Sequence, residues 1–160
     1  MTSDFMVTVQ SGQEEKHYVR SVKYTKDLAS KRVLAKLELE RIFWQRRDVE
    51  WAVVTEQDIP RDIVQNMRWL HPYFDVTQHS DLDPRTLDRV DQVLFEKLWA
   101  KEGTLANCAA DCDDVLGLKP GTSLMAARHF LAVRRWRTDL SRRLDPTKTV
   151  EVYDDRRVPA

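Results

Sequence analysis

The stretch SVKYTKDLASKRVLAKLELERIFWQRRDVEWAVVTE, residues 21–56, decides the fold. Its first residues end an extended, β-branched segment, residues 19–23, and residues 31–46 carry a long run of helix-forming side chains. Residues 51–55 are a short valine-rich run, typical of a strand that is buried on both faces. A strand, a crossover helix and a second strand make a βαβ unit, so we expect a mostly parallel sheet.

The helix in this stretch carries its charges in an unusual place. On a helical wheel of about 100° per residue, Lys36 and Glu40 lie four residues apart in the middle of a broad apolar arc. A charge there costs several kcal/mol to desolvate unless it is paired. Two interpretations stay open: a salt bridge whose tips reach water, or a charged cleft that holds a metal ion or a phosphate.

Composition limits the class of protein. The chain has 160 residues, which suits one domain or two small ones, and its 26 basic and 26 acidic residues balance. Attraction to DNA must therefore come from local patches. No apolar run is long enough for a membrane span and no signal peptide is evident, so we expect a soluble cytoplasmic protein. Cys108 and Cys112, one helical turn apart, are expected to be reduced core thiols.

A hairpin precedes the deciding stretch, with a strand over residues 3–9, a turn at residues 11–13 in which Gly12 supplies the bend, and a return strand to Lys23. Antiparallel pairing puts Asp4 and Lys23 at the same edge of the sheet, close to the helix that carries Glu40. A carboxylate can bind Mg²⁺, and a lysine beside the metal can stabilise charge on a phosphoryl group. The arrangement is that of a metal-dependent phosphodiesterase, although acids and lysines at strand ends are more often simply solvated.

The second half of the chain is expected to be a separate module. The polar residues 75–84 are interpreted as a linker. Apolar periodicity and helix-ending glycines predict helices at about residues 61–70, 84–101, 104–115 and 122–134. Residues 136–140 and 149–153 alternate like the strands of a hairpin. The last three helices and the hairpin together predict a winged helix-turn-helix domain.

Six arginines crowd the last helix and the hairpin: Arg128, Arg134, Arg135, Arg137, Arg142 and Arg143. Such a patch can neutralise phosphates. The last helix otherwise presents small and apolar side chains, residues 124–127 and Phe130, which read few bases. This favours nonspecific DNA contact or a protein partner over sequence readout. Partner docking, contact with the DNA backbone and a plain solvated face all stay open.

Four segments carry a family resemblance in their order and spacing: SDFMVTVQSG (3–12), SVKYTKDLASKRVLAKLELERIFW (21–44), VEWAVVTEQDIP (49–60) and QNMRWLHPY (65–73). Together they resemble the TnsA-type endonuclease subunit of heteromeric cut-and-paste transposases. The resemblance implies an α/β unit followed by an α unit. These are a partial restriction-endonuclease-like catalytic domain over residues 1–75 and a winged-helix domain over residues 82–155.

The resemblance also implies roles for individual residues. Asp4 would be the metal-binding aspartate, and Lys23 the catalytic lysine. Ser21 stands at a second metal-binding position, where members often have a glutamine and a backbone carbonyl can serve. Glu40 falls in a Glu-x-Glu-Arg segment and would be a further site residue, whereas Ala35 replaces a glutamate. Family members carry more residues before the Asp-Phe strand, including a metal-binding glutamate. We therefore expect a truncated core or half of a split enzyme.

The implied activity is hydrolysis of a phosphodiester at the 5′ ends of the transposon, with Mg²⁺ (or Mn²⁺) as the cofactor. The implied partners are transposon-end DNA, a TnsB-like transposase and a TnsC-like AAA+ ATPase, with no membrane involved. Whether the chain is an enzyme by itself stays open. The alternative function is a non-catalytic winged-helix adaptor, or a DNA-binding protein, of the transposition machinery.

Overall fold

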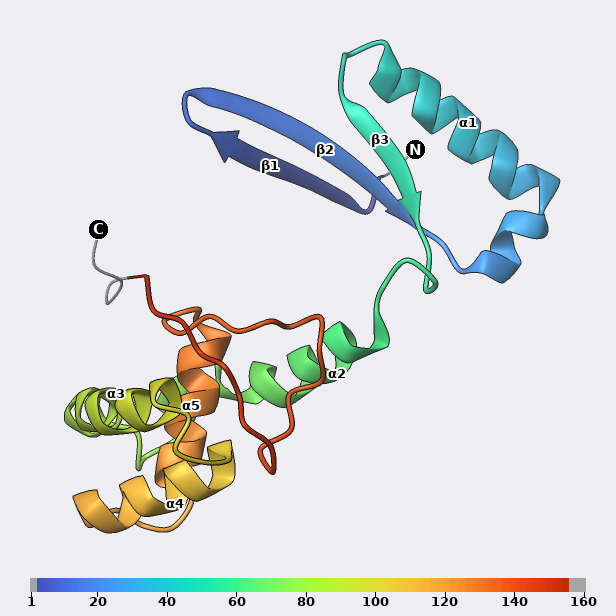
Figure 1. Cartoon of the computed structure of the whole chain (residues 1–160). Helices are drawn as coiled ribbons and strands as arrows, with labels where there is room; N and C mark the ends of the chain where they lie inside the picture. The colour runs from blue at the N-terminus through green and yellow to red at the C-terminus, as the bar shows by residue number, and fades with distance from the viewer. Residues whose placement is uncertain (1–2, 156–160) are drawn as a thin grey trace. The chain divides into compact units, whose positions relative to one another are not determined.

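The first part of the chain is a small α/β unit (Figure 1). The computed structural model describes residues 3–155, and the chain divides into two compact units after Pro60. In the first unit, β1 (Phe5–Ser11), β2 (Glu14–Val22) and β3 (Glu50–Val54) form a sheet in the order β1-β2-β3. β1 pairs with β2 antiparallel, and β2 pairs with β3 parallel. The predicted hairpin and βαβ unit are both confirmed.

The turn between β1 and β2 sets the register of the sheet. Ser11 pairs with Glu14, so Gly12 and Gln13 alone form the loop, and Gly12 has a φ of 65°. Glycine adopts this left-handed conformation without steric cost. In this register Phe5 lies opposite Arg20, which brings the start of β1 to the end of β2.

The crossover between β2 and β3 contains a short 3₁₀ helix, η1 (Thr25–Ala29), and the long helix α1 (Lys31–Gln45). Only Leu37 and Glu40 of α1 are buried. Its other apolar side chains are spread around the helix, and Leu39, for example, is 61% exposed. The broad arc predicted from the helical wheel is therefore not a buried face.

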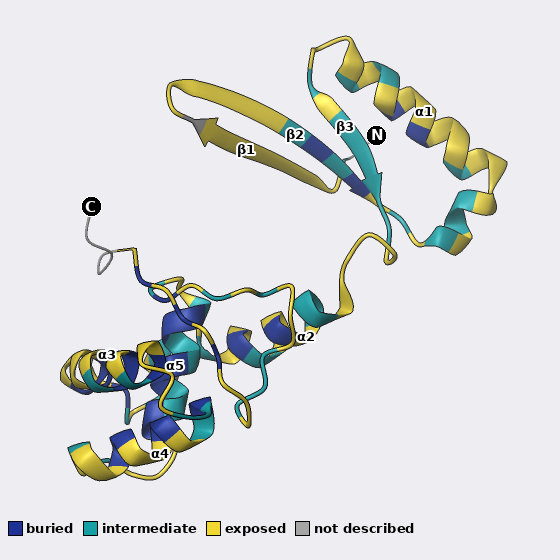
Figure 2. Cartoon of the chain, viewed as in Figure 1, coloured by how far each residue is buried: buried dark blue, intermediate teal, exposed yellow. Residues whose placement is uncertain are grey.

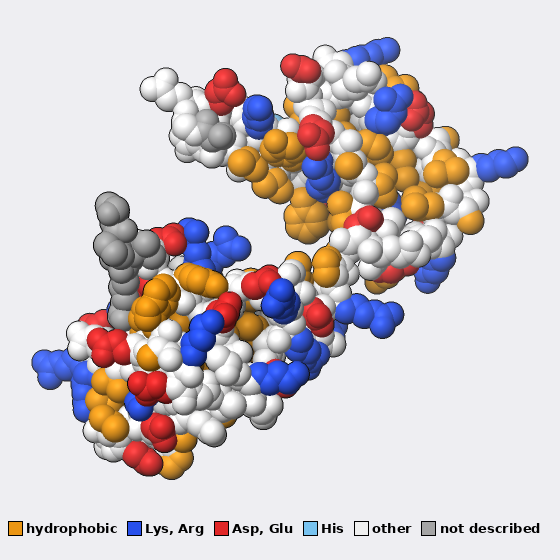
Figure 3. All heavy atoms as spheres, viewed as in Figure 1, with side chains coloured by type: hydrophobic (Ala, Val, Ile, Leu, Met, Phe, Trp, Pro, Cys, Tyr) orange, Lys and Arg blue, Asp and Glu red, His pale blue; other side chains and the backbone are white. Residues whose placement is uncertain are grey.

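The first unit has a small core of its own. Val19 of β2 and Leu37 of α1 are its buried apolar side chains in the part of the chain that the structure describes. Every residue of β1 whose exposure is described is exposed, and Phe5 and Met6 are 61% and 57% exposed although they point to opposite faces (Figure 2). Figure 3 shows hydrophobic side chains gathered on the surface of this unit.

The second unit is helical and better packed. Its helices are α2 (Arg61–Leu70), α3 (Pro84–Trp99), α4 (Leu105–Leu116) and α5 (Thr122–Ala132), with short 3₁₀ turns η2 (His71–Tyr73) and η3 (Val76–Gln78). The main hydrophobic core lies here, and Ala126, Ala127 and Phe130 of α5 are fully buried in it. No helix within residues 3–155 combines the length and apolar character that crossing a membrane requires.

Side-chain caps explain where these helices begin. Asp83 accepts hydrogen bonds from the backbone N–H groups of Arg85 and Thr86 at the start of α3, and Thr104 accepts one from Asn107 at the start of α4. The buried Asp113 carboxylate accepts from the N–H groups of Gly121 and Ser123, at 2.6 and 2.7 Å. Asp113 therefore ties the end of α4 to the start of α5.

The chain after α5 differs from the sequence prediction. The two strands expected at residues 136–140 and 149–153 are reduced to one β-bridge, between Arg137 and Tyr153. Asp139, in the first expected strand, accepts a hydrogen bond from the backbone N–H of Ser141 and so forms a local turn, and Asp145 forms a similar turn with Thr147 in the connection. The hairpin of a winged helix-turn-helix is thus not formed in the described residues.

The boundary between the units also differs from the predicted domains, residues 1–75 and 82–155. The structure places α2 with the second unit, because Asn66 of α2 is buried and donates hydrogen bonds to the carbonyls of Leu140 and Arg142. The amphipathic pattern of residues 61–70 predicts a helix, but it does not indicate which unit the apolar side of that helix packs against.

Candidate active site

Asp4 and Lys23 meet at one edge of the sheet. Asp4 lies just before β1 and Lys23 just after β2, and the antiparallel register brings these ends together. The distance from Lys23 Nζ to Asp4 Oδ2 is 3.4 Å. The predicted convergence of this carboxylate and this amine is therefore confirmed, whereas their catalytic roles remain a prediction.

The Asp4 carboxylate is held in its ionised form. The backbone N–H of Val22 donates to Asp4 Oδ2 at 2.7 Å, and this bond, together with the nearby Lys23, lowers the pKa of Asp4 below its ordinary value. Lys23 Nζ also donates to the carbonyl of Val22 at 2.7 Å. The Asp4 side chain is 42% exposed, so it is in contact with solvent as well as with these donors.

A buried network lies beside this pair and is centred on Glu40 of α1, which is 6% exposed. Glu40 Oε1 accepts hydrogen bonds from the hydroxyls of Ser3 and Ser21, at 2.5 and 2.6 Å. Trp44 Nε1 donates to Ser3 Oγ at 2.9 Å, and Trp51 Nε1 donates to Ser21 Oγ at 3.2 Å. Each serine therefore accepts from an indole and donates to the carboxylate.

The network supports the two segments that carry the charged pair. Ser3 directly precedes Asp4, and Ser21 lies two residues before Lys23. Glu40 therefore joins α1 to both ends of the hairpin through two short hydrogen bonds. The side chain of Ser21 is used in this network, and the metal role predicted for this position, through its backbone carbonyl, stays a prediction.

The structure rules out one of the two interpretations of Lys36 and Glu40, namely the salt bridge between them. Lys36 is exposed, and no salt bridge joins it to Glu40 in the described part of the chain. Instead, hydroxyl donors compensate the buried carboxylate of Glu40. The serine hydroxyls thus supply the hydrogen bonds that a buried carboxylate requires.

The residues present match a divalent cation only in part. Asp4 offers an exposed carboxylate of the kind that Mg²⁺ prefers, but Glu40 Oε1 already accepts two hydrogen bonds. Within residues 3–155, no group of three or more His, Cys, Asp or Glu side chains is arranged to hold a metal ion. The described side chains therefore provide one ligand rather than a complete coordination shell.

Arg128, predicted to bind DNA or a partner, is turned into the second unit. Its guanidinium donates through Nε and Nη2 to the carbonyl of Trp69, and it lies 3.8 Å from the ring centre of Tyr73. Burial lowers the pKa of Arg128 from its ordinary value. These contacts attach α5 to α2 and η2, so the structure gives this arginine a packing role.

The other five predicted arginines differ in their contacts. Three are ion-paired: Arg135 with Asp88 and Asp91, Arg137 with Asp155, and Arg142 with Asp139. Arg134 and Arg143 are exposed and form no ion pair with any described residue. Their binding roles stay predictions, and the ion pairs show that much of the basic charge is already compensated locally.

Sequence reasoning missed Ser3, Trp44 and Trp51 as members of the Glu40 network. Trp44 follows Glu40 by four residues, and residues at this spacing share one side of a helix. That spacing could have indicated the contact. The two serines carried no comparable signal, because a serine at a strand end is usually a solvated turn residue.

An α/β unit with an acid and a lysine at the sheet edge, followed by a helical unit, fits an endonuclease-like fold, and both parts match known families. Residues 1–56 match the family described as TnsA-like endonuclease N terminal, and residues 58–140 match TnsA endonuclease C terminal. The chain belongs to the TnsA endonuclease family. The resemblance inferred from the four sequence segments is therefore confirmed.

A curated relative is the Transposon Tn7 transposition protein TnsA of Escherichia coli. The two chains are 35% identical over 71 residues, which cover 44% of this chain and 26% of the relative. The chain thus spans about a quarter of the length of the relative that it matches.

Proposed function

We propose that the chain is an endonuclease subunit of a cut-and-paste transposition system, and that it hydrolyses a phosphodiester at the 5′ ends of the element. The observation that carries the proposal is the Asp4–Lys23 pair, with 3.4 Å between Oδ2 and Nζ, at the edge of a βαβ unit. Membership of the TnsA endonuclease family supports it, as does the similarity to a transposition protein.

The proposed chemistry assigns a task to each side chain. Asp4, ionised at neutral pH, would bind Mg²⁺ (or Mn²⁺), and a divalent cation so bound polarises a phosphoryl oxygen. Proteins usually bind Mg²⁺ through one or two carboxylates and several waters, which agrees with the single exposed carboxylate here. Lys23 would place its ammonium against the negative charge that develops on the phosphoryl group. Glu40 would hold both segments in position.

The proposed partners are DNA at the transposon ends, a TnsB-like transposase and a TnsC-like AAA+ ATPase. Of the six arginines predicted to bind DNA or a partner, Arg134 and Arg143 are exposed and keep no ion pair with any described residue, so they are proposed to contact these partners. A winged-helix architecture for this unit remains part of the proposal, and the bridge between Arg137 and Tyr153 joins the two segments expected to form its hairpin.

A plasmid-nicking assay tests the proposal. Supercoiled DNA carrying transposon ends is incubated with the full chain and Mg²⁺ or Mn²⁺, with and without the partner transposase. We expect Asp4→Ala and Lys23→Ala each to reduce nicking by about 10²–10³-fold, as removal of a group that stabilises the transition state does. Lys26→Ala, which removes an exposed lysine of the same unit, is the matched control.

Nicking that survives both substitutions would refute the assigned site. If no combination of partners gives nicking while the chain still binds the AAA+ ATPase, the chain acts as a non-catalytic adaptor instead. A tight, sequence-specific footprint without nicking would identify a DNA-binding regulator.

A further inference from the structure

A second candidate site lies in the helical unit, where α2 faces the loop that follows α5. The side chains of Gln65, Arg68 and Trp69 on α2, and of Arg143 and Asp145 in the loop, line an open pocket of about 490 Å³. A pocket of this size can hold a phosphodiester with an adjoining sugar. Of the basic side chains here, Arg143 belongs to the predicted arginine patch and Arg68 does not.

The wall of the pocket is built around Asn66, which is 1% exposed. Its Nδ2 donates to the carbonyls of Leu140 and Arg142, at 2.9 and 2.7 Å, and its Oδ1 accepts from the N–H of Leu144 at 2.8 Å. Both amide hydrogens and the amide oxygen are thereby used. Asn66 fixes the loop against α2, and Arg143 of the loop and Arg68 of α2 line the same pocket.

The charges in the pocket are not balanced. Arg68 and Arg143 form no ion pair with any residue in the range 3–155, in contrast to Arg135, Arg137 and Arg142. The acid in the lining, Asp145, is engaged elsewhere.

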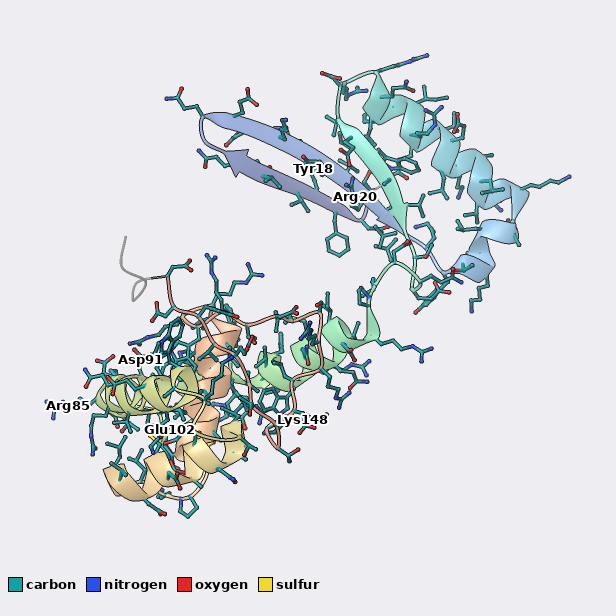
Figure 4. All side chains as sticks on the ribbon, in the orientation of Figure 1. Tyr18, Arg20, Arg85, Asp91, Glu102 and Lys148 are labelled. Atoms are coloured by element: carbon teal, nitrogen blue, oxygen red, sulfur yellow. The ribbon has the colours of Figure 1, made fainter. Side chains whose placement is uncertain are left out.

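The hydroxyl and the backbone N–H of Thr147 donate to the Asp145 carboxylate, at 2.7 and 2.9 Å, and lower its pKa. Lys148, labelled in Figure 4, lies 3.9 Å from the same carboxylate and adds to this effect, as does Arg143 from a greater distance. Two arginines thus line the pocket, and the acid in its lining already accepts hydrogen bonds from Thr147.

We infer that this pocket binds a phosphate group of the DNA backbone, with Arg68 and Arg143 as the two charged donors. The planar fork of a guanidinium matches a pair of phosphate oxygens, and the amide of Gln65 provides a neutral donor. None of the lining side chains is a large exposed hydrophobic group, as the centre of a protein interface would require. The choice of DNA as the source of the phosphate rests on the proposed function.

Fluorescence polarisation of labelled duplex DNA tests the inference, with the full chain, without divalent metal, over a series of NaCl concentrations. We expect the double variant Arg68→Ala/Arg143→Ala to bind about 10-fold more weakly to any sequence. The slope of log K against log salt should fall by about 1, because each phosphate contact contributes about 0.9 to it. Circular dichroism checks that the variant folds.

The matched control is Lys101→Ala/Lys119→Ala, which removes two exposed lysines of the same unit. Both are ion-paired outside the pocket, with Glu151 and Asp81. An unchanged slope in the control and a reduced slope in the arginine variant support the inference. Equal slopes in the two variants, or no DNA binding by the unaltered chain, overturn it.

Two further measurements separate the possible ligands. Inorganic phosphate, added at constant ionic strength, should compete with DNA for the unaltered chain and not for the arginine variant. If the arginine variant binds DNA normally but loses a protein partner, the pocket is a protein-binding site and the inference fails. Asp4→Ala is expected to lose nicking and keep the salt slope, so failure of the proposed function is seen separately.

Discussion

Glu40 of α1 accepts a hydrogen bond from Ser21 of β2 at 2.6 Å, within the network that also holds Ser3. Glu40→Ala leaves both hydroxyls without their acceptor in a buried place, so we expect the first unit to lose about 1–3 kcal/mol of stability. Glu40→Gln keeps an acceptor oxygen and should lose less. Urea unfolding and amide hydrogen exchange of β2 measure the effect. Glu38→Ala, on the exposed side of α1, is the control, and equal losses in both would contradict the prediction.

Asp4 should make the stability of the first unit depend on pH. The Val22 N–H and Lys23 lower the pKa of its carboxyl in the folded chain below the ordinary value of 3.8. Its ionised form therefore favours folding above about pH 4, and this contribution is lost as the pH falls through the folded pKa. The difference in urea midpoint between the unaltered chain and Asp4→Asn should be constant near pH 7 and shrink below pH 4. A difference that does not change with pH would count against this.

Arg128 should matter for stability rather than for binding. Arg128→Ala removes donors to the Trp69 carbonyl and the stacking on Tyr73, and we expect a loss of about 2–3 kcal/mol. Arg128→Lys should recover little, because an ammonium lacks the planar group that donates twice to the Trp69 carbonyl and stacks on Tyr73. Thermal unfolding of the second unit measures both. The exposed Arg134→Ala is the comparison, and a matching loss there would argue against a special role for Arg128.

Asn66 should keep the loop of residues 140–149 well ordered. Asn66→Ala removes three hydrogen bonds and leaves three partly buried backbone groups without these partners, so a loss of about 1–3 kcal/mol is expected. Limited proteolysis should then cut within residues 140–149 faster than in the unaltered chain. The Gln65→Ala variant, altered at the exposed neighbouring position, should be cleaved at the same rate as the unaltered chain. Unchanged cleavage of the Asn66 variant would show that the loop is held by other contacts.

Cys108 and Cys112 should be unreactive while the chain is folded. Burial raises the pKa of both thiols above their ordinary value of 9.0, which leaves little thiolate at neutral pH. A disulfide reagent at pH 8 should modify neither thiol rapidly in the folded chain and both in urea. The number of thiols modified over time measures this, and rapid modification of the folded chain would disprove the prediction.

Much of the first unit could be predicted from local patterns. Gly12 marks a two-residue turn, and the periodicity of residues 19–55 gives a strand, a helix and a strand in the observed order. Pairing rules then bring Asp4 to Lys23 without further information. The Glu40 network could not be predicted, since it depends on the rotation of α1 over the sheet, and no apolar stripe specifies that rotation.

The prediction was weaker after α5. Residues 136–140 and 149–153 have strand-like alternation, yet Asp139 accepts a hydrogen bond from the backbone N–H of Ser141 and forms a local turn at the end of the first segment. Strand propensity does not show whether such local hydrogen bonds are more favourable than the inter-strand hydrogen bonds of a sheet. Likewise, six arginines look alike in a sequence. Only the structure shows that Arg128 is turned inward, whereas Arg143 is exposed and lines the same pocket as Arg68.

β2 bonds to β1 on one side and to β3 on the other, and this has a kinetic consequence. The β1–β2 hairpin closes over two residues and can form within about 1–10 μs, whereas β3 joins only after the crossover is in place. The parallel pairing is therefore expected to be the slow step of refolding. During synthesis, the hairpin leaves the ribosome well before its third strand and waits with one edge unpaired.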